Sequence, residues 1–169
     1  REMSLKILTE QDPKFELEPS KRYLSNILGH KMIYSKQMKK KVLESFAILK
    51  SIHKKLINCE EQVRTSCWTI VRQLLDSSNW KTFASLDEVL PVIAEIDEGE
   101  YIKQINKFID NNLDEFKKLV EEQDEFVAVH KYTSGLYWSL ELLSWNPEHI
   151  MNAFEILCKV SKYDKKAIE

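Results

Sequence analysis

The sequence has few residues that interrupt helices, with 3 Gly and 4 Pro among 169 residues. The glycines Gly29, Gly99 and Gly135 are isolated, which excludes a Walker loop and a dinucleotide-binding fingerprint, since both need several glycines at fixed spacing. The interruptions fall between segments of helical period. The clearest is Asn146-Pro147, where the asparagine can cap a helix and the proline can occupy its first turn. We therefore expect helices packed in antiparallel pairs.

Long hydrophobic runs are also absent. No apolar run approaches the roughly 18 residues that cross a bilayer, and the stretch from Arg1 to Leu5 has no apolar signal-peptide core. These absences predict no membrane partner and a cytoplasmic location. The chain does not begin with Met, so we expect a fragment of a larger protein.

Cysteine and histidine are too scattered to form a recognisable site. The three cysteines contain no C-x-x-C pair, so we expect reduced thiols, with Cys67 and Cys158 buried on apolar helix faces. The four histidines have no partner at metal-ligand spacing, and neither G-x-S-x-G nor H-E-x-x-H occurs. We therefore predict no catalytic, cofactor-binding or metal-binding residues, and no enzyme. An enzyme whose site is assembled from scattered residues is the alternative.

The charge is unevenly distributed along a chain of ordinary globular composition, 43% hydrophobic and 31% charged. Residues 21–81 hold 13 Lys or Arg against 4 Asp or Glu, whereas residues 95–125 hold 4 against 11. The net charge of −2 therefore conceals a basic and an acidic stretch, which could steer a partner or pair neighbouring copies end to end.

The spacing of apolar residues predicts one all-α domain of stacked antiparallel helical hairpins, as in an α-solenoid of HEAT or TPR type or a superhelical piece. Four parts are expected: an N-terminal connector (1–19), a helical array (20–120), a loop with a short strand around Phe126, Val127 and Val129 (121–133), and a terminal helical hairpin (134–164). Within the connector, Pro13 and Pro19 predict an extended segment.

The longest predicted helix runs roughly from Ser35 to Leu56. Its apolar residues recur at three- and four-residue steps and are expected to face the core: Met38, Val42, Phe46, Leu49, Ile52 and Leu56. The opposite face carries lysines, which form the candidate binding surface: Lys36, Lys39, Lys40, Lys50 and Lys54. Such a face attracts phosphate backbones or an acidic protein. An exposed, solvated helix face is the favoured interpretation, because no arginine or aromatic residue is interleaved for base contact.

Capping patterns mark two further helix starts, Ser85 to Glu88 and Asp97 to Glu100. In the terminal hairpin, the apolar positions expected to face inward are Leu136, Leu140 and Leu143 on the first helix and Ile150, Phe154, Leu157 and Val160 on the second. Trp138 lies off the first of these stripes. We interpret it as an anchor for a partner or as a contact with a neighbouring helix pair.

With these segments placed, residues 5–164 resemble part of the helical-repeat region of very large bacterial proteins with an N-terminal STAND-type nucleotide-binding domain. The likeness includes the segment SGLYWSLELLSWNPEHIMNAFEILCKVSKYD, and its most specific part is LYWSLE followed by WNPEH within that segment. The resemblance implies a superhelical array of α-helices that acts as a sensor or scaffold. Some STAND proteins with such arrays recognise viral proteins and trigger defence. It carries over no active-site residue and no nucleotide-binding motif.

We therefore predict a non-enzymatic helical-repeat interaction or scaffold module of a larger bacterial protein, such as the sensor part of a STAND-type NTPase. Its partner is expected to be a protein or other domains of the same parent chain, without a cofactor. The alternative is a nucleic-acid-binding helical domain that uses the lysine face between Lys36 and Lys54.

Overall fold

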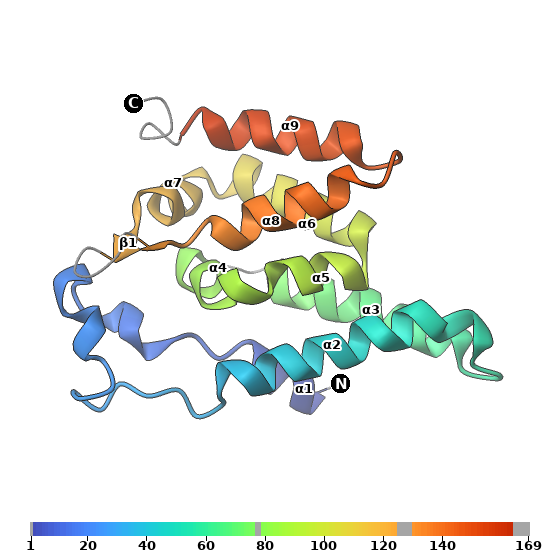
Figure 1. Ribbon diagram of the computed structural model, residues 1–169, viewed down its shortest axis with the longest axis horizontal. Helices are drawn as coiled ribbons and strands as arrows, with labels where there is room; N and C mark the ends of the chain where they lie inside the picture. Colours follow the sequence, from blue (N-terminus) through green and yellow to red (C-terminus); the bar gives the residue numbers. More distant parts are fainter. Residues whose placement is uncertain (1, 77–78, 125–129, 164–169) are drawn as a thin grey trace.

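The computed structural model describes residues 2–76, 79–124 and 130–163, and helices make up nearly all of its regular structure (Figure 1). The α-helices are α1 (Glu2–Leu8), α2 (Lys36–Ile52), α3 (Glu60–Leu75), α4 (Trp80–Leu86), α5 (Leu90–Ile96), α6 (Glu98–Asn111), α7 (Leu113–Glu121), α8 (Ser134–Ser144) and α9 (Ile150–Ser161). Four 3₁₀ helices add short turns: η1 (Pro13–Glu16), η2 (Pro19–Leu24), η3 (His53–Lys55) and η4 (Asp87–Val89). The all-α class is confirmed. No helix in these ranges has the length and apolar character needed to cross a membrane.

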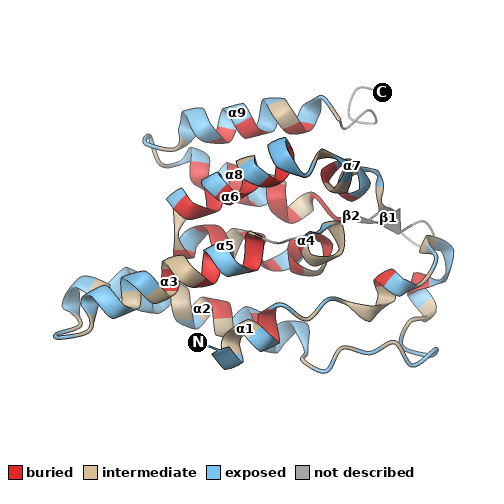
Figure 2. Cartoon of the chain, turned by 180° about the vertical axis from the view of Figure 1, so that it is seen from behind, coloured by how far each residue is buried: buried red, intermediate tan, exposed pale blue. Residues whose placement is uncertain are grey.

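The helices form two rows that stand side by side. In one row α2 packs against α5 and α5 against α8; in the other α3 packs against α6 and α6 against α9. The chain passes between the rows within the pairs α2/α3, α5/α6 and α8/α9, while α4 packs on α7 beside them. Figure 2 shows that buried residues concentrate in the central helices and that α2 and α9 lie at opposite edges of the stack.

The core of the stack is apolar, with one buried polar contact between α6 and α8. Fully buried side chains line both rows, among them Ile70, Ile93 and Ile105. The hydroxyls of Tyr101 and Ser139 lie 2.5 Å apart inside this core. Burial raises the pKa of Tyr101, so its phenol stays protonated and able to donate.

The N-terminal connector is more ordered than predicted. It begins with α1, and the segment between the two prolines is not extended, because Pro13 starts η1 and Pro19 starts η2. Phe15 is buried between Trp80 and Tyr132. Its ring meets both of theirs edge-on, with ring centroids 5.4 Å and 5.0 Å apart. Two prolines in first-turn positions thus initiate short helices rather than preventing them.

The predicted loop 121–133 contains the only strand pair of the described ranges. β1 (Gln123–Asp124) pairs antiparallel with β2 (His130–Lys131). The predicted strand residues Phe126, Val127 and Val129 lie outside the described residues. Next to this pair, buried Arg22 holds Glu122 at 2.7 Å and so ties the N-terminal segment to the end of α7.

Helix α2 begins as predicted, with the Ser35 hydroxyl accepting the Met38 N–H, but it is rotated relative to the expected orientation. The fully buried positions are Lys39 and Leu43, while Met38, Leu49 and Ile52 are exposed. The expected stripe is therefore divided: Val42 and Phe46 are partly buried against the core, whereas Met38, Leu49 and Ile52 face solvent. The predicted orientation was wrong in part, because it assumed that the more apolar face must be the buried one.

Of the two capping patterns, one is wrong and one is half confirmed. Ser85 caps nothing: α4 continues past it, and its hydroxyl donates to the Lys81 carbonyl while accepting the Asp12 N–H. Asp97 does cap α6 through the Glu100 N–H at 3.0 Å. The Glu100 carboxylate does not reach back to the cap and instead enters the contact between α3 and α6.

The terminal hairpin is confirmed as a pair of helices, but α9 is oriented differently from the prediction. The Asn146 side chain accepts the Glu148 N–H in the turn before α9, but the helix begins only at Ile150 and has no side-chain cap, so the predicted cap at Asn146 and the first-turn position of Pro147 were wrong. On α8 the predicted leucines are buried, whereas on α9 the residues exposed to solvent include Ile150, Phe154 and Leu157. Ala153, Ile156 and Val160 are the α9 residues that are buried, so only Val160 of the predicted set faces the core.

The first turn of α8 approaches η4 so closely that only glycine fits. A Cβ on Gly135 would lie 1.7 Å from the backbone oxygen of Asp87, whose carboxylate accepts the Gly135 N–H at 2.7 Å. Gly99, at the start of α6, offers the opposite case, because a Cβ there meets nothing nearer than 3.9 Å. The two glycines thus form a matched pair.

We predict that Gly135→Ala lowers the free energy of unfolding by about 2–3 kcal/mol, because the new methyl group collides with backbone that cannot move aside. Gly99→Ala is expected to be neutral or to stabilise by up to about 1 kcal/mol through helix propensity. Urea unfolding monitored by circular dichroism measures both. Equal effects of the two substitutions would contradict the close contact of α8 with η4.

The orientation of α2 is tested by two adjacent lysines. Lys39→Glu places a buried carboxylate beside Glu10 and should cost about 3 kcal/mol or more. Lys40→Glu, with the same charge change at an exposed position, should alter the free energy of unfolding by no more than about 0.5 kcal/mol. If the second variant is the more damaged in urea unfolding, the orientation described here is wrong.

Candidate interaction surfaces

The five lysines of the predicted binding face do not form one exposed surface. Lys36 pairs with Glu88 at 2.5 Å, and Lys50 pairs with Asp97 at 3.4 Å. Lys40 and Lys54 are exposed. Lys36 and Lys50, together with Lys39, instead attach α2 to the rest of the molecule.

Lys39 is the most deeply placed of these cations, with 2% of its surface exposed. Its ammonium donates to the Glu10 carbonyl at 2.5 Å and lies 3.5 Å from the Glu10 carboxylate. Burial lowers the pKa of Lys39, while Glu10 opposes that change by favouring the charged form. The contact holds α2 against the segment that follows α1.

A small cavity of about 30 Å³ adjoins Lys39 and is lined by charged and polar residues that include Asp12, Ser85 and Asp87. That volume holds about one or two water molecules. Ser85 and Asp87 are engaged by backbone N–H groups, as described above. The cavity therefore lies in a polar contact between α2 and the α4–η4 region, and it is too small for an organic ligand.

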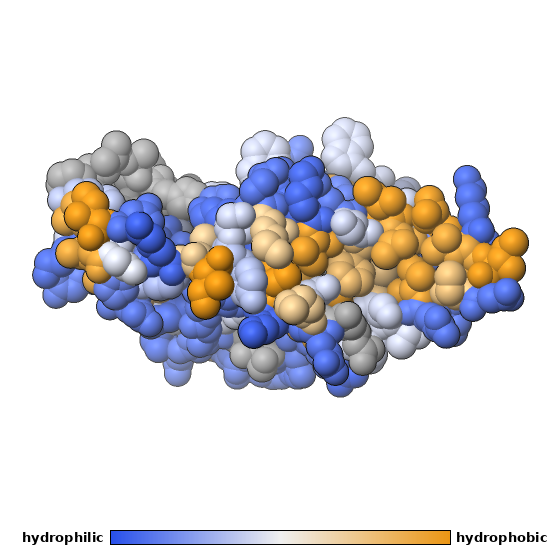
Figure 3. All heavy atoms as spheres, turned by 90° about the horizontal axis from the view of Figure 1, so that it is seen from below, coloured by the Kyte–Doolittle hydropathy of each residue, from blue (hydrophilic) through white to orange (hydrophobic). Residues whose placement is uncertain are grey.

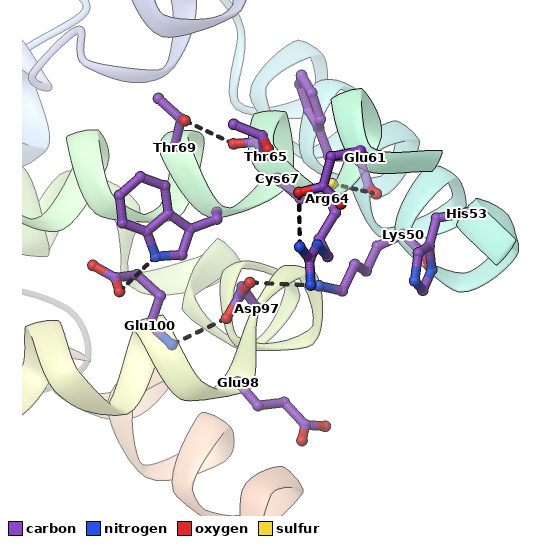
Figure 4. Close-up of polar contacts among 12 residues, drawn as sticks. Lys50, His53, Glu61, Arg64, Thr65, Cys67, Thr69, Asp97, Glu98 and Glu100 are labelled. Carbon is purple, nitrogen blue, oxygen red and sulfur yellow. Dashed lines mark hydrogen bonds and ion pairs between the residues drawn. The ribbon is translucent and has the colours of Figure 1, made fainter. Parts of the chain in front are cut away.

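A larger open cleft of about 520 Å³ lies where α2, α3 and the start of α6 meet. Lys50 and Asp97 reach toward each other across it, and Arg64 pairs with Glu61 at 2.7 Å on its rim (Figure 4). Figure 4 also shows Glu98 pointing away from this group; it contacts His149 at 2.9 Å instead. The four charged residues that line the cleft, Lys50, Glu61, Arg64 and Asp97, thus pair with one another.

Below the cleft, α3 and α6 share a buried polar network centred on Glu100. One carboxylate oxygen accepts the indole N–H of Trp68 at 2.8 Å, and the other accepts the Gln104 amide at 2.7 Å. The guanidinium of Arg72 stacks on the Trp68 ring at 5.0 Å. This network fixes how α3 lies on α6, while the buried side-chain oxygen of Gln104 has no hydrogen-bond partner among the described residues.

The most conspicuous exposed surface is apolar and follows the outer side of α2. We call it the α2 ridge; it consists of Met38, Val42, Ile48, Leu49 and Ile52, and all but half-buried Val42 are exposed. Seen from this side, the molecule carries a hydrophobic band that widens toward the end of the α2–α3 hairpin (Figure 3), where Ile57 is also exposed. A band of this kind on one helix is typical of an interaction surface.

The opposite end of the stack also carries an apolar surface, here in the form of a groove between α8 and α9. The α8–α9 groove has a volume of about 260 Å³ and is lined by Tyr137, Leu140, Glu141, Ser144, Ile150, Ala153, Phe154 and Leu157. Phe154 is 60% exposed. Trp138, 64% exposed on α8, and Trp145 stand at the same end. The exposure of Trp138 confirms that it lies off the buried stripe of α8.

Both surfaces escaped the sequence analysis, and for different reasons. On α2, the feature that could have indicated the surface is the spacing of Lys36, Lys39 and Lys50. This spacing places three cations on one side of the helix, where acidic residues of the same molecule can pair with them. On α9, the feature that could have indicated the groove is the width of the apolar face. Ile150, Met151 and Phe154 make this face wider than a single buried stripe, so part of it must lie at the surface.

Comparison with protein-family models, curated proteins and solved structures gave no match to this chain. Among the residues that the structure describes, no group of three or more His, Cys, Asp or Glu is placed to hold a metal ion. The surfaces described above are therefore assessed by their own chemistry.

The three cysteines differ in burial, which predicts different reactivity. Cys67 is buried as expected, and burial raises the pKa of its thiol; Cys158 is exposed, so the prediction that it is buried was wrong. We expect an aromatic disulfide reagent at about pH 8 to modify Cys158 and Cys59 in the folded protein, and Cys67 only after unfolding. The Cys158→Ser variant serves as the control and should lose one rapidly modified thiol. Three equal rates in the folded wild type would contradict this arrangement.

Proposed function

We propose that this chain is a non-enzymatic helical interaction module whose partner binds the α2 ridge, the α8–α9 groove or both. The observation that carries the proposal is the outward apolar face of α2. A helix that turns lysines toward its own protein and leucine and isoleucine toward solvent leaves uncompensated apolar area, at about 25 cal/mol per Å². A partner that covers this face gains that free energy.

The packing of the helices supports a finer assignment, namely a short α-solenoid of three hairpins. The pairs α2/α3, α5/α6 and α8/α9 each contribute one helix to each row. In solenoids, each repeat packs on its neighbours, and the end repeats need a polar outer face unless further structure covers them. Apolar faces on both α2 and α9 agree with a unit that has neighbours at both ends.

The nucleic-acid alternative has weaker support, because Lys36, Lys39 and Lys50 are held in internal ion pairs. A salt-titrated gel shift with duplex and single-stranded probes tests it. We expect no retardation at about 150 mM salt; retardation that depends on Lys40 and Lys54 would favour the alternative over the protein-binding proposal.

The proposal is tested by site-specific photocrosslinking in cells that make the protein. A benzophenone amino acid at Trp138 or Ile48 should yield a covalent product with a protein, and mass spectrometry should map it to one defined surface. The same residue at exposed Gln73 on α3 is the matched control and should yield none. Crosslinks that are absent at both faces, or equally frequent at Gln73, would refute the interaction module.

The resemblance to STAND-type proteins adds a proposal about context. We propose that the module is the sensor part of a larger bacterial NTP-binding protein that acts in the cytoplasm. The full gene tests this directly, because a Walker motif is expected N-terminal to residue 1. A parent protein without a nucleotide-binding domain would refute the context and leave the interaction module in place.

A further inference from the structure

The α2 ridge is convex and apolar, and the α8–α9 groove is concave and apolar. The ridge presents Ile48, Leu49 and Ile52 at helical spacing along one side of α2, the pattern by which an amphipathic helix enters a hydrophobic groove. The groove runs along α9 and is open at the surface. At 1.5 Å per residue, α2 is about 25 Å long and α9 about 18 Å, so the two surfaces are of similar extent.

The charges beside the two surfaces are opposite in sign. Lys41, on the same side of α2 as Ile48, pairs with Glu44 at 2.7 Å, whereas Lys54 and Lys55 are exposed in η3 at the end of the ridge. At the groove, Glu141 forms part of the lining and Glu148 is exposed in the turn before α9. Opposite charges around apolar centres favour one orientation of approach and raise the association rate.

The two surfaces lie at opposite ends of the stack, with α2 at one edge and α9 at the other (Figure 1). A contact between them therefore cannot form within one molecule and cannot be symmetric between two. It joins the end of one molecule to the start of the next, which makes the interface heterologous.

From this complementarity we infer that the α2 ridge of one copy docks in the α8–α9 groove of a second copy, head to tail. The inference rests on the proposed function and names its partner. Leu49 and Ile52 of the ridge contact Phe154 and Leu157 of the groove, and Lys54 and Lys55 approach Glu141 and Glu148. Each copy retains one open surface, so the association continues along a row of copies.

Two variants block one surface each. Ile52→Glu places a charge on the ridge, and Phe154→Glu places one in the groove; both positions are exposed, so the fold should persist, which circular dichroism checks. In sedimentation experiments the wild type should form species larger than its 20.0 kDa monomer as concentration rises. Either variant alone should weaken self-association at least tenfold. Ile48→Glu gives a second ridge variant, and Ile27→Glu, exposed outside both surfaces, is the matched control that should behave as wild type.

The decisive sample is an equimolar mixture of Ile52→Glu and Phe154→Glu. Head-to-tail docking leaves one good ridge and one good groove in the mixture, so it should yield a heterodimer of twice the 20.0 kDa monomer mass and nothing larger. Raising NaCl from about 50 to about 500 mM should weaken this dimer, because salt screens the flanking charges.

Three results would overturn the inference: a monomeric wild type at about 0.5 mM, a mixture that stays monomeric while the wild type associates, or variants that associate as the wild type does. A monomeric wild type whose two surfaces still crosslink to a different protein would remove the second copy as partner and retain the interaction module. Without such crosslinks, the proposed function fails as well.

Discussion

The structure depends on how α2 is attached to the rest of the molecule. Lys39 and Lys50 point inward and meet Glu10 and Asp97, and exposed Lys36 pairs with Glu88 at the edge of the contact, so ion pairs contribute where only apolar contacts were expected. Buried Leu43 and the partly buried Val42, Phe46 and Ala47 supply the apolar part of this attachment. The basic stretch of the chain is thus partly neutralised by acidic residues of the same molecule. Because lysines occupy part of the inner side, Met38, Ile48, Leu49 and Ile52 remain at the surface.

This orientation determines what the molecule offers to a partner. The central helices bury their apolar residues on all sides, whereas α2 and α9 each have a buried side and an apolar outer side. The stack therefore ends in two surfaces that resemble the contacts between its own layers. The polar clefts, by contrast, are filled by ion pairs such as Lys50–Asp97 and by the Glu100 network, which join helices to each other. This distribution supports the proposed recognition by the ends of the stack.

The sequence predicted the class of fold and most helices, because the apolar residues of α3, α6 and α8 recur on one face and those faces are the buried ones. It did not predict the orientation of α2. Its lysine face can turn inward as readily as its apolar face when acidic residues elsewhere in the chain pair with the lysines. Lys39 and Glu10 are 29 residues apart, and no local pattern reveals that they pair. The α8–α9 groove was missed for a related reason. An amphipathic pattern shows that a helix has an apolar side, but only packing shows how much of that side the neighbours cover.

The orientation of α2 is the central claim, and methyl relaxation by a soluble paramagnetic agent measures it most directly. In protein labelled at isoleucine δ1 methyl groups and kept dilute enough to be monomeric, Ile48 and Ile57 should be relaxed as strongly as exposed Ile27. Ile70 and Ile93, in the core, should be protected. Protection of Ile48 to the level of Ile93 would show that the apolar side of α2 is buried and would contradict the account.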